Sequence, residues 1–344
     1  MILLRILLFP FSWIYYVVTE IRNRMYDQGL KPSVRFEVPV ISVGNLSVGG
    51  TGKTPMIEYL IRLLQPQHKV ASLSRGYGRK SDGFRIAGSQ DNAQTLGDEP
   101  FQLYKKYGQN ITVSVGEERA LAIPLILQDH EDTQVILLDD AFQHRQVVPQ
   151  FSILLTDYQK PFFEDYILPS GRLRERRASA KRADVIVVTK CPAAISENEM
   201  TAIANSVRHY AEKPIFFSTI RYGRVTPFQN SVYQPVEKVA LITAIANADP
   251  LIDYVKHNYT LAKHFAYRDH HYYSLNDVKT WTEFAGRNPD TIFLTTEKDK
   301  VKLETPELLN ELSCLCLYYL PIEMEFVKGG REFDEMLINA IKSA

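Results

Sequence analysis

A glycine-rich stretch between an apolar run and an amphipathic segment constrains the fold of this chain more than any other feature. The apolar residues 38–43 predict a buried strand, and the apolar residues within 56–64 recur at helical spacing. Between them, residues 44–54 read Gly-Asn-Leu-Ser-Val-Gly-Gly-Thr-Gly-Lys-Thr. A glycine-rich turn in this position can direct successive backbone N–H groups at phosphate oxygens, and the helix N-terminus adds its positive dipole end. The stretch therefore predicts a phosphate-binding loop in an α/β protein.

Individual residues of this loop have expected roles. Lys53 would lie along the β- and γ-phosphates of a nucleotide, and the Thr54 hydroxyl would bind Mg²⁺. Ser47 stands where such loops usually carry their first glycine, and a glycine-rich turn that binds nothing is the alternative. The residues expected to contact ATP are Ser47, Val48, Gly49, Gly50, Thr51, Gly52, Lys53 and Thr54.

Two aspartates follow a second apolar run. Residues 135–138 read as a buried parallel strand, which would place Asp139 and Asp140 at the carboxyl edge of the sheet, where ligands bind. An aspartate at a strand end beside a phosphate loop is the expected partner of Mg²⁺. A pair of N-cap residues for the next helix is the alternative. The sequence thus predicts a Mg²⁺ site at Thr54, Asp139 and Asp140.

The order of apolar runs predicts the architecture. A chain of 344 residues is long enough for two domains. Further strands are expected at residues 69–74, 111–115, 151–157 and 183–189, and in a second lobe at 238–243, 291–295 and 315–320. We expect a P-loop NTPase-like, mostly parallel sheet with helices on both faces, and a smaller α/β C-terminal lobe joined by a two-stranded ribbon. The expected boundaries are 1–24 for an N-terminal anchor helix, 25–214 for the ATP-binding core, 215–236 for the ribbon, whose second strand would lie near Val232, and 237–344 for the C-terminal lobe.

The N-terminal 19 residues are almost entirely apolar or aromatic, with Arg5 as their one charge. The run is short for a bilayer span, which needs about 20 apolar residues. Aromatic residues next to cations are typical of an interfacial anchor on the cytoplasmic side of a membrane. We therefore expect a membrane-associated helix seated on phospholipid; a helix packed on the body of the protein is the alternative.

Composition narrows the function classes. With 40 basic and 40 acidic residues the net charge is zero, whereas a nucleic-acid-binding protein usually has a basic excess. Three cysteines, Cys191, Cys314 and Cys316, are too few for a disulfide framework and indicate a reducing compartment. We expect all three in the core and no nucleic acid as partner.

Several loops carry charged residues that could act on an anionic ligand. Arginines follow expected strands in two loops, where they could bind phosphate or simply be solvated. These residues are Arg75, Arg79, Arg172 and Arg174. Asp98 opens an expected helix and could serve as a base or only favour the helix dipole. His270 lies in an Asp-His-His run that indicates a hydrogen-bonded Asp-His element, with surface histidines as the alternative. Pro192 stands where guanine-specific NTPases carry an aspartate, which favours ATP.

Together these motifs resemble the tetraacyldisaccharide 4'-kinase (lipid A 4'-kinase) family of Gram-negative bacteria. The resemblance extends from the N-terminus to about residue 303 and rests on the segments 44–55, 74–79, 97–100, 139–144, 168–175, 269–271 and 296–299. It implies transfer of the γ-phosphate of ATP to the 4'-hydroxyl of a tetraacylated glucosamine disaccharide 1-phosphate. The reaction would take place at the cytoplasmic face of the inner membrane, between two lobes that close on the nucleotide.

The resemblance also implies roles for single residues. Asp98 would be the base, supported by His270, and Glu175 would act near the Mg²⁺ site at Asp139 and Asp140. Arg174 and the arginines around it would meet phosphates, and no protein partner is implied. The chain departs from the family pattern at three places, which are Ala141 and Ala244 in place of glycine, and Tyr267-Arg268 in place of Phe-Pro. A membrane-associated P-loop NTPase switch or assembly factor is the rival interpretation, and a soluble small-molecule kinase is a third.

Overall fold

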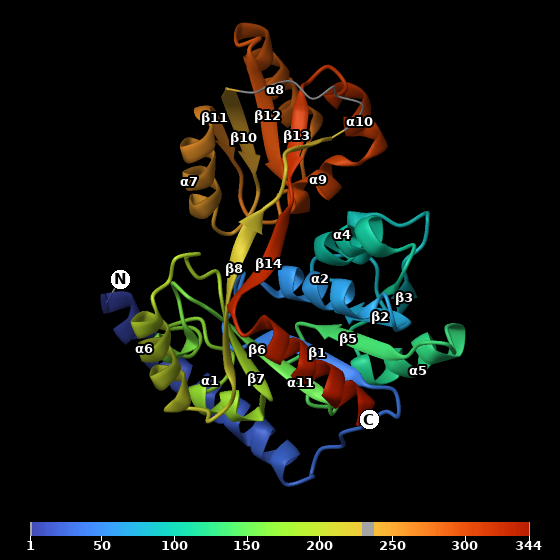
Figure 1. The fold of residues 1–344 in the computed structure, drawn as a ribbon, viewed down its shortest axis with the longest axis vertical. Helices are drawn as coiled ribbons and strands as arrows, with labels where there is room; N and C mark the ends of the chain where they lie inside the picture. Colours follow the sequence, from blue (N-terminus) through green and yellow to red (C-terminus); the bar gives the residue numbers. More distant parts are fainter. Residues whose placement is uncertain (1, 229–236, 344) are drawn as a thin grey trace.

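The computed structural model describes residues 2–228 and 237–343, which form two α/β lobes joined by a pair of strands (Figure 1). The larger lobe is built on a nine-stranded sheet in the order β14-β8-β7-β6-β1-β5-β2-β4-β3. Its strands are β1 (Val40–Asn45), β2 (Val70–Ser74), β3 (Arg85–Ile86), β4 (Thr112–Val115), β5 (Val135–Asp139), β6 (Phe151–Asp157), β7 (Val185–Thr189), β8 (Ile215–Tyr222) and β14 (Ile322–Lys328). The six apolar runs that predicted strands in this lobe all form them.

Strand β1 lies at the point where the sheet's connections diverge. It pairs in parallel with β5 on one side and with β6 on the other. Only β3 and β14 run antiparallel to their neighbours in this sheet. Ligands of doubly wound sheets bind beyond the carboxyl ends of the strands at such a point. The glycine-rich loop, which directly follows β1, therefore occupies the position that the topology favours for a ligand.

Alternate residues of β1 and β5 face two different helix layers, as expected for a strand that is buried on both faces. Ile41 and Val43 pack in a core with α2 (Lys53–Leu64), α4 (Asp98–Tyr107) and α11 (Gly330–Lys342). Val40 packs on the opposite face against α5 (Arg119–Asp129). The remaining helices of this lobe are α1 (Ile2–Asp27), α3 (Ala93–Leu96), α6 (Glu197–Arg208) and the 3₁₀ turns Phe162–Glu164 and Arg177–Arg182. Mostly parallel strands with helices on both faces confirm the predicted fold of this part.

The smaller lobe has a five-stranded sheet in the order β11-β10-β12-β13-β9. Its strands are β9 (Thr226–Pro227), β10 (Lys238–Thr243), β11 (Thr260–Ala266), β12 (Thr291–Thr296) and β13 (Leu317–Leu320). Its helices are α7 (Asp249–Asn258), α8 (Leu275–Arg287), α9 (Glu297–Leu303) and α10 (Pro306–Leu312). Trp281 of α8, with no exposed surface, lies in the main core of this lobe together with Phe293 of β12.

The ribbon between the lobes differs from the prediction. Strand β8 pairs with β14, so that Tyr222 lies opposite Ile322, a hundred residues further along the chain. The expected second strand near Val232 lies outside the described residues. After β14 the chain returns to the larger lobe, where Phe333 and Leu337 of α11 are fully buried against its sheet. The expected boundary of 237–344 for the second lobe is therefore too long, because the apolar face of α11 completes the core of the first.

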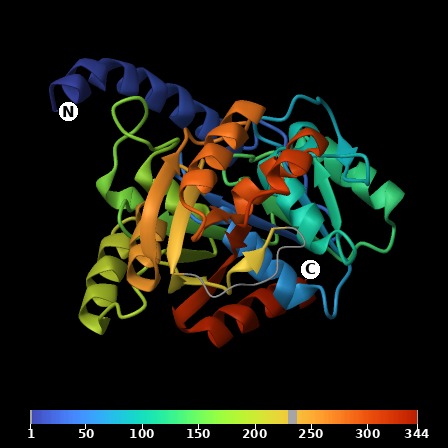
Figure 2. The same cartoon turned by 90° about the horizontal axis from the view of Figure 1, so that it is seen from above.

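Helix α1 lies along the edge of the larger lobe (Figures 1 and 2). Its buried side is polar: the Ser12 hydroxyl is 2.7 Å from Ser170 Oγ, and Glu20 forms ion pairs with Arg24 and Arg176. Its outward side is apolar, with the exposed residues Leu7, Phe9, Phe11, Trp13, Ile14, Val18 and Ile21. Within residues 2–228 and 237–343, no helix is long and apolar enough to span a bilayer.

The cysteine prediction is only partly right. Cys191 is buried in the core, whereas Cys314 and Cys316 are exposed. These two residues lie in the turn between α10 and β13, because the expected strand at 315–320 begins only at Leu317.

Candidate functional site

The loop after β1 has the backbone geometry of a phosphate-binding turn. Gly49 and Gly52 have φ values of 110° and 85°, which side chains strongly disfavour, and α2 begins directly afterwards at Lys53. Ser47 is buried and forms an isolated antiparallel bridge with Leu173, without a positive φ. Serine is therefore accommodated at the position where such loops usually carry glycine, because the backbone there is extended.

Residues from β7 and β6 hold this loop in place. The Thr189 hydroxyl lies 2.8 Å from the backbone oxygen of Thr51, and Lys190 Nζ contacts the backbone oxygen of Gly50. Lys190 is in turn fixed by an ion pair of 2.8 Å with Asp157. Lys190 was not among the residues expected at the site, so this contact was missed. Its position directly after the expected strand at 183–189 was the available signal.

Two aspartates at the end of β5 occupy different electrostatic environments. Asp139 is buried, and its Oδ1 has no hydrogen-bond partner among the described residues. Burial, reinforced by the neighbouring Asp140 against the opposing charge of Lys53, raises the pKa of Asp139 to about 6. Burial acts in the same direction on Asp140, but Lys53 at 3.7 Å and Arg174 at 2.9 Å outweigh it and lower the pKa of Asp140. Lys53, Asp140 and Arg174 thus meet at one point beside the phosphate loop.

The four predicted arginines divide into two groups. Arg174 pairs with Asp140. Arg75 is exposed, and its positive charge contributes to lowering the pKa of Arg119 and of His144. The side chain of Arg79, however, is 2% exposed and pairs with Glu117, and Arg172 pairs with Asp165 at 2.8 Å. These latter two side chains hold loops together. The backbone of Arg172 still lies beside the phosphate loop, because its oxygen accepts a hydrogen bond of 2.8 Å from Val48 N.

Arg119, which sequence reasoning missed, lies beneath the aspartates. It is 1% exposed, and its guanidinium donates a hydrogen bond of 2.8 Å to the backbone oxygen of Gly116. Burial lowers the pKa of Arg119 to about 10, although Asp139 and Asp140 oppose this shift. An arginine at the first position of a helix gives no sequence signal that it will be buried.

Glu175 is buried next to a cation. It is 1% exposed and forms an ion pair of 2.7 Å with Arg182, whose guanidinium also lies over the ring of Phe142. Its Oε1 has no hydrogen-bond partner in the described part of the chain. The structure therefore places Glu175 in a buried ion pair near the expected site.

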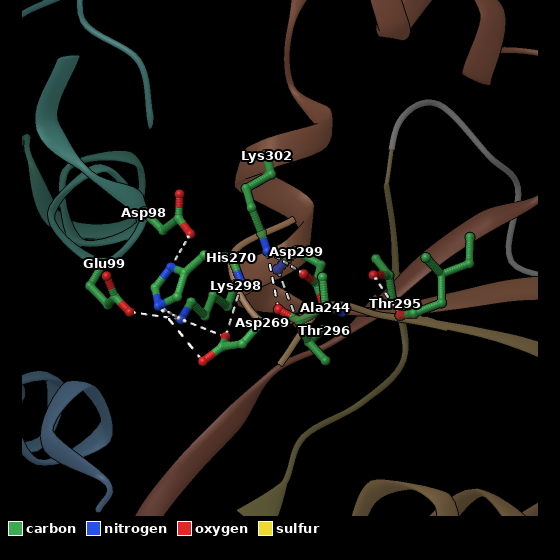
Figure 3. Close-up of polar contacts among 11 residues, drawn as sticks. Asp98, Glu99, Ala244, Asp269, His270, Thr295, Thr296, Lys298, Asp299 and Lys302 are labelled. Atoms are coloured by element: carbon green, nitrogen blue, oxygen red, sulfur yellow. Dashed lines mark hydrogen bonds and ion pairs between the residues drawn. The ribbon is translucent and has the colours of Figure 1, made fainter. Parts of the chain in front are cut away.

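Asp98 and His270 meet across the two lobes (Figure 3). Asp98 is the first residue of α4 and is buried, while His270 lies in the loop between β11 and α8. His270 Nδ1 is 3.0 Å from Asp98 Oδ2, and this hydrogen bond is the main cause of the raised pKa of His270. The negative charge of the adjacent Glu99 contributes to raising the pKa of Asp139, so the start of α4 also lies near the aspartates at the end of β5. The predicted pair is thus formed next to the predicted phosphate site.

The three departures from the family pattern are accommodated. Ala141 is buried in the core below β5, and its N–H donates a hydrogen bond of 3.2 Å to Val43 O. Ala244 is fully buried, and its N–H is 3.0 Å from Asp299 Oδ2. The Tyr267 hydroxyl accepts a hydrogen bond of 3.0 Å from Trp281.

Comparisons with known proteins agree with this arrangement. A family model described as tetraacyldisaccharide-1-P 4'-kinase matches residues 4–342. Proteins named tetraacyldisaccharide 4'-kinase from Flavobacterium johnsoniae and Flavobacterium psychrophilum are 42% and 44% identical to this chain. Each alignment covers 99% of this chain and 98% of the relative.

A similar solved structure is described as the "apo" form of LpxK from Aquifex aeolicus in complex with ATP. It has a TM-score of 0.77 and 26% identity, and the match covers 98% of this chain and 99% of that one. The resemblance inferred from the motifs is confirmed over nearly the whole chain, which therefore belongs to the tetraacyldisaccharide-1-P 4'-kinase family.

Proposed function

We propose that this chain transfers the γ-phosphate of ATP to the 4'-hydroxyl of tetraacyldisaccharide 1-phosphate in lipid A biosynthesis. The observation that carries the proposal is the contact of 3.0 Å between Asp98 and His270 across two lobes, the larger of which carries the glycine-rich loop at the start of α2. A family match over nearly the whole chain favours the kinase over the rival NTPase switch or assembly factor. An NTPase switch has no need of a base delivered from one lobe and oriented by the other.

The loop would hold the nucleotide as the sequence predicted. Backbone N–H groups of residues 47–54 would bind the phosphates, and the chain's relative from Aquifex aeolicus, described as a complex with ATP, supports ATP as the nucleotide. Lys53 would exchange its contact of 3.7 Å with Asp140 for the β- and γ-phosphates. Arg174 and Arg75 are the arginines placed to meet phosphate, whereas Arg79 and Arg172 would act through the loops that they hold.

The residues beside the loop fit Mg²⁺, which prefers oxygen ligands from one or two carboxylates together with phosphates and water. The fit rests on the buried, unpartnered Oδ1 of Asp139 and on Asp140 next to it. Thr54, Asp139 and Asp140 would hold the ion, which would neutralise charge on the transferring phosphoryl group. Among the residues that the structure describes, no group of three or more His, Cys, Asp or Glu side chains is arranged to hold a metal ion, so Thr54 and the phosphates would complete the ligand set. Glu175, whose Oε1 has no hydrogen-bond partner among the described residues, would act near this Mg²⁺ site.

Phosphoryl transfer requires chiefly positioning and charge neutralisation from the protein. Asp98 would accept the proton of the 4'-hydroxyl while the oxygen attacks the γ-phosphorus, and His270 would hold the carboxylate in orientation. Because Asp98 and His270 come from different lobes, the pair is complete only when the lobes are together. The hydroxyl would thus be activated only in the closed site.

Helix α1 would seat the protein on the phospholipid surface at the cytoplasmic face of the inner membrane. Support comes from its outward row of exposed apolar residues, which includes Phe11 and Trp13, and from its polar contacts with the larger lobe. A helix with one apolar face toward solvent is suited to lie in a membrane interface. The acyl chains of the substrate could then remain in the bilayer while the sugar enters the site.

A labelling experiment tests the function. The purified full chain is given γ-labelled ATP, Mg²⁺ and the tetraacylated disaccharide 1-phosphate in mixed micelles. We expect the label on the lipid, and Lys53→Ala should remove it because the β- and γ-phosphates lose their cation. Label that appears only as free phosphate would contradict the kinase and favour the NTPase.

A further inference from the structure

Lys298 connects the two lobes beside the Asp98–His270 pair (Figure 3). It is the second residue of α9 in the smaller lobe, and its Nζ lies 2.8 Å from Glu99 Oε1 in α4 of the larger lobe. The same Nζ is 3.6 Å from Asp269 Oδ1 and 3.4 Å from His270 Nε2. The side chain is only 22% exposed. An ammonium group has three donor hydrogens, and three acceptors surround this one.

The contacts at the two ring nitrogens of His270 select one protonation state. An ionised Asp98 carboxylate can only accept a hydrogen bond, so Nδ1, at 3.0 Å from it, must carry a proton. The Lys298 ammonium can only donate, so Nε2 opposite it must offer a lone pair. Asp269 Oδ2, which would favour a proton on Nε2, is 3.8 Å away and beyond hydrogen-bond distance. Both close contacts therefore favour the neutral Nδ1–H tautomer.

We propose that Lys298 is a positioning residue that holds His270 as the neutral Nδ1–H tautomer and so keeps Asp98 a charged base for the substrate hydroxyl. This proposal rests on the proposed function. In the reaction, the hydroxyl proton passes to Oδ1 of Asp98, the carboxylate oxygen that does not contact His270, while the oxygen–phosphorus bond forms and the bond from the γ-phosphorus to ADP breaks. An imidazolium at this position would instead neutralise the Asp98 carboxylate and weaken it as a base.

The charges around His270 show why a cation is needed there. Asp98 and Glu99 face the ring from α4, Asp269 lies on its own loop, and Lys298 faces it from α9. The hydrogen bond with Asp98 raises the pKa of His270, and the charges of Glu99 and Asp269 act in the same direction. Burial and the charge of Lys298 oppose them. Without Lys298, three carboxylates would stabilise the imidazolium.

The backbone below Lys298 is held rigidly. Asp299 and Lys302 form a fully buried ion pair of 2.7 Å in the same helix. Asp299 Oδ2 also accepts hydrogen bonds of 2.7 Å from the Thr296 hydroxyl and 3.0 Å from Ala244 N. The first turn of α9 is thus tied to the end of β10, which fixes the point from which Lys298 reaches His270.

Spectroscopy of the full chain tests the tautomer without any activity assay. With ¹⁵N-labelled histidine, two-bond ¹H–¹⁵N spectra distinguish the protonated ring nitrogen, and His270→Gln identifies the signal. At about pH 8, well above the usual histidine pKa, we expect a proton on Nδ1 and none on Nε2. A proton on Nε2 would overturn the proposal.

Variants test the role of the charge. Lys298→Met should raise the pKa of His270 by about 1 pH unit or more, because it removes a like charge near the ring. The acid limb of the kcat profile should move to higher pH by the same amount, and kcat should fall about 10- to 100-fold with KM for ATP nearly unchanged. Lys298→Arg, which keeps the charge, should restore most of the activity. Lys300→Met removes a cation from the same helix, where it pairs with Glu304 at 2.7 Å, and should change neither quantity.

The outcomes separate this inference from the function that it rests on. If Lys298→Met leaves the pKa of His270 and the kcat profile unchanged in a folded protein, the inference is wrong, and the proposed kinase function is unaffected. If the wild-type chain places no phosphate on the lipid, the proposed function fails, while the spectra still report the tautomer.

Discussion

Asp98→Asn separates the basicity of Asp98 from its geometry. Asparagine has nearly the shape of aspartate, and its side-chain oxygen can still accept the hydrogen bond that His270 Nδ1 donates over 3.0 Å. The variant therefore keeps the contact between the lobes but cannot take the hydroxyl proton. A positioned general base contributes about 10²- to 10⁴-fold in rate, so we expect kcat to fall by that factor. This corresponds to about 2.7–5.4 kcal/mol of lost transition-state stabilisation.

The assay compares two quantities in the same preparation. Single-turnover transfer to the lipid gives the rate of the chemical step, and calorimetric titration with ATP gives its Kd, which should change by less than about twofold because the phosphates are held by the loop. Asp290→Asn is a matched control, since Asp290 pairs with Lys238 on the surface, away from the site. If Asp98→Asn weakens ATP binding as much as it slows transfer, Asp98 binds nucleotide and the assignment of a base is refuted.

Three further predictions concern the membrane, the core and pH. Phe11→Gln combined with Trp13→Gln should lower binding to anionic phospholipid vesicles by about tenfold or more, whereas Leu121→Gln, another exposed apolar residue, should not. Leu337→Ala should lower the free energy of unfolding by about 2–5 kcal/mol in denaturant titrations, because this α11 side chain is fully buried in the larger lobe; a smaller effect would contradict that packing. Burial lowers the pKa of His144 to about 4, so the unfolded chain binds its proton first and stability is lost as pH falls from about 6.5 to 4. Tm measured against pH should therefore fall less between about pH 6.5 and 4 in His144→Gln than in the wild type. The same dependence of Tm on pH in both proteins would contradict this role of His144.

Local patterns were sufficient to predict six strands of the larger lobe and the glycine-rich turn that follows β1. Alternate residues of β1 face different helix layers, and a strand buried on both faces reads as a continuous apolar run. The positive φ angles of Gly49 and Gly52 follow directly from residue type. The Asp98–His270 pair followed from the family resemblance, because nothing local relates residues 172 positions apart.

What sequence reasoning missed depends on contacts between distant segments. The pairing of β8 with β14 and the return of α11 to the larger lobe have no local signal, since α11 is simply amphipathic. The side chain of Arg79 was expected to face an anion, but the carboxylate of Glu117 takes that place. Cys316 was expected in the core because the strand was predicted two residues too early, and Cys314 lies in the turn before that strand.

Sequence patterns also did not predict which face of α1 is buried against the larger lobe. Polar residues such as Ser12 and Glu20 are buried because the larger lobe supplies partners for them. The apolar residues remain on the outside, opposite to the usual arrangement of a surface helix. Hydrophobicity alone predicts that such a helix meets something apolar, and only the structure tells which side does so.

In the proposed reaction, the γ-phosphate leaves ATP for the sugar hydroxyl in the site between the lobes. The most direct measurement is the ratio of ADP formed to 4'-phosphorylated lipid formed, with the lipid quantified by ³¹P NMR as a second phosphomonoester. We expect one ADP for each new phosphomonoester and, in Asp98→Asn, a proportional loss of both. ADP formation that continues without the second phosphomonoester would contradict it.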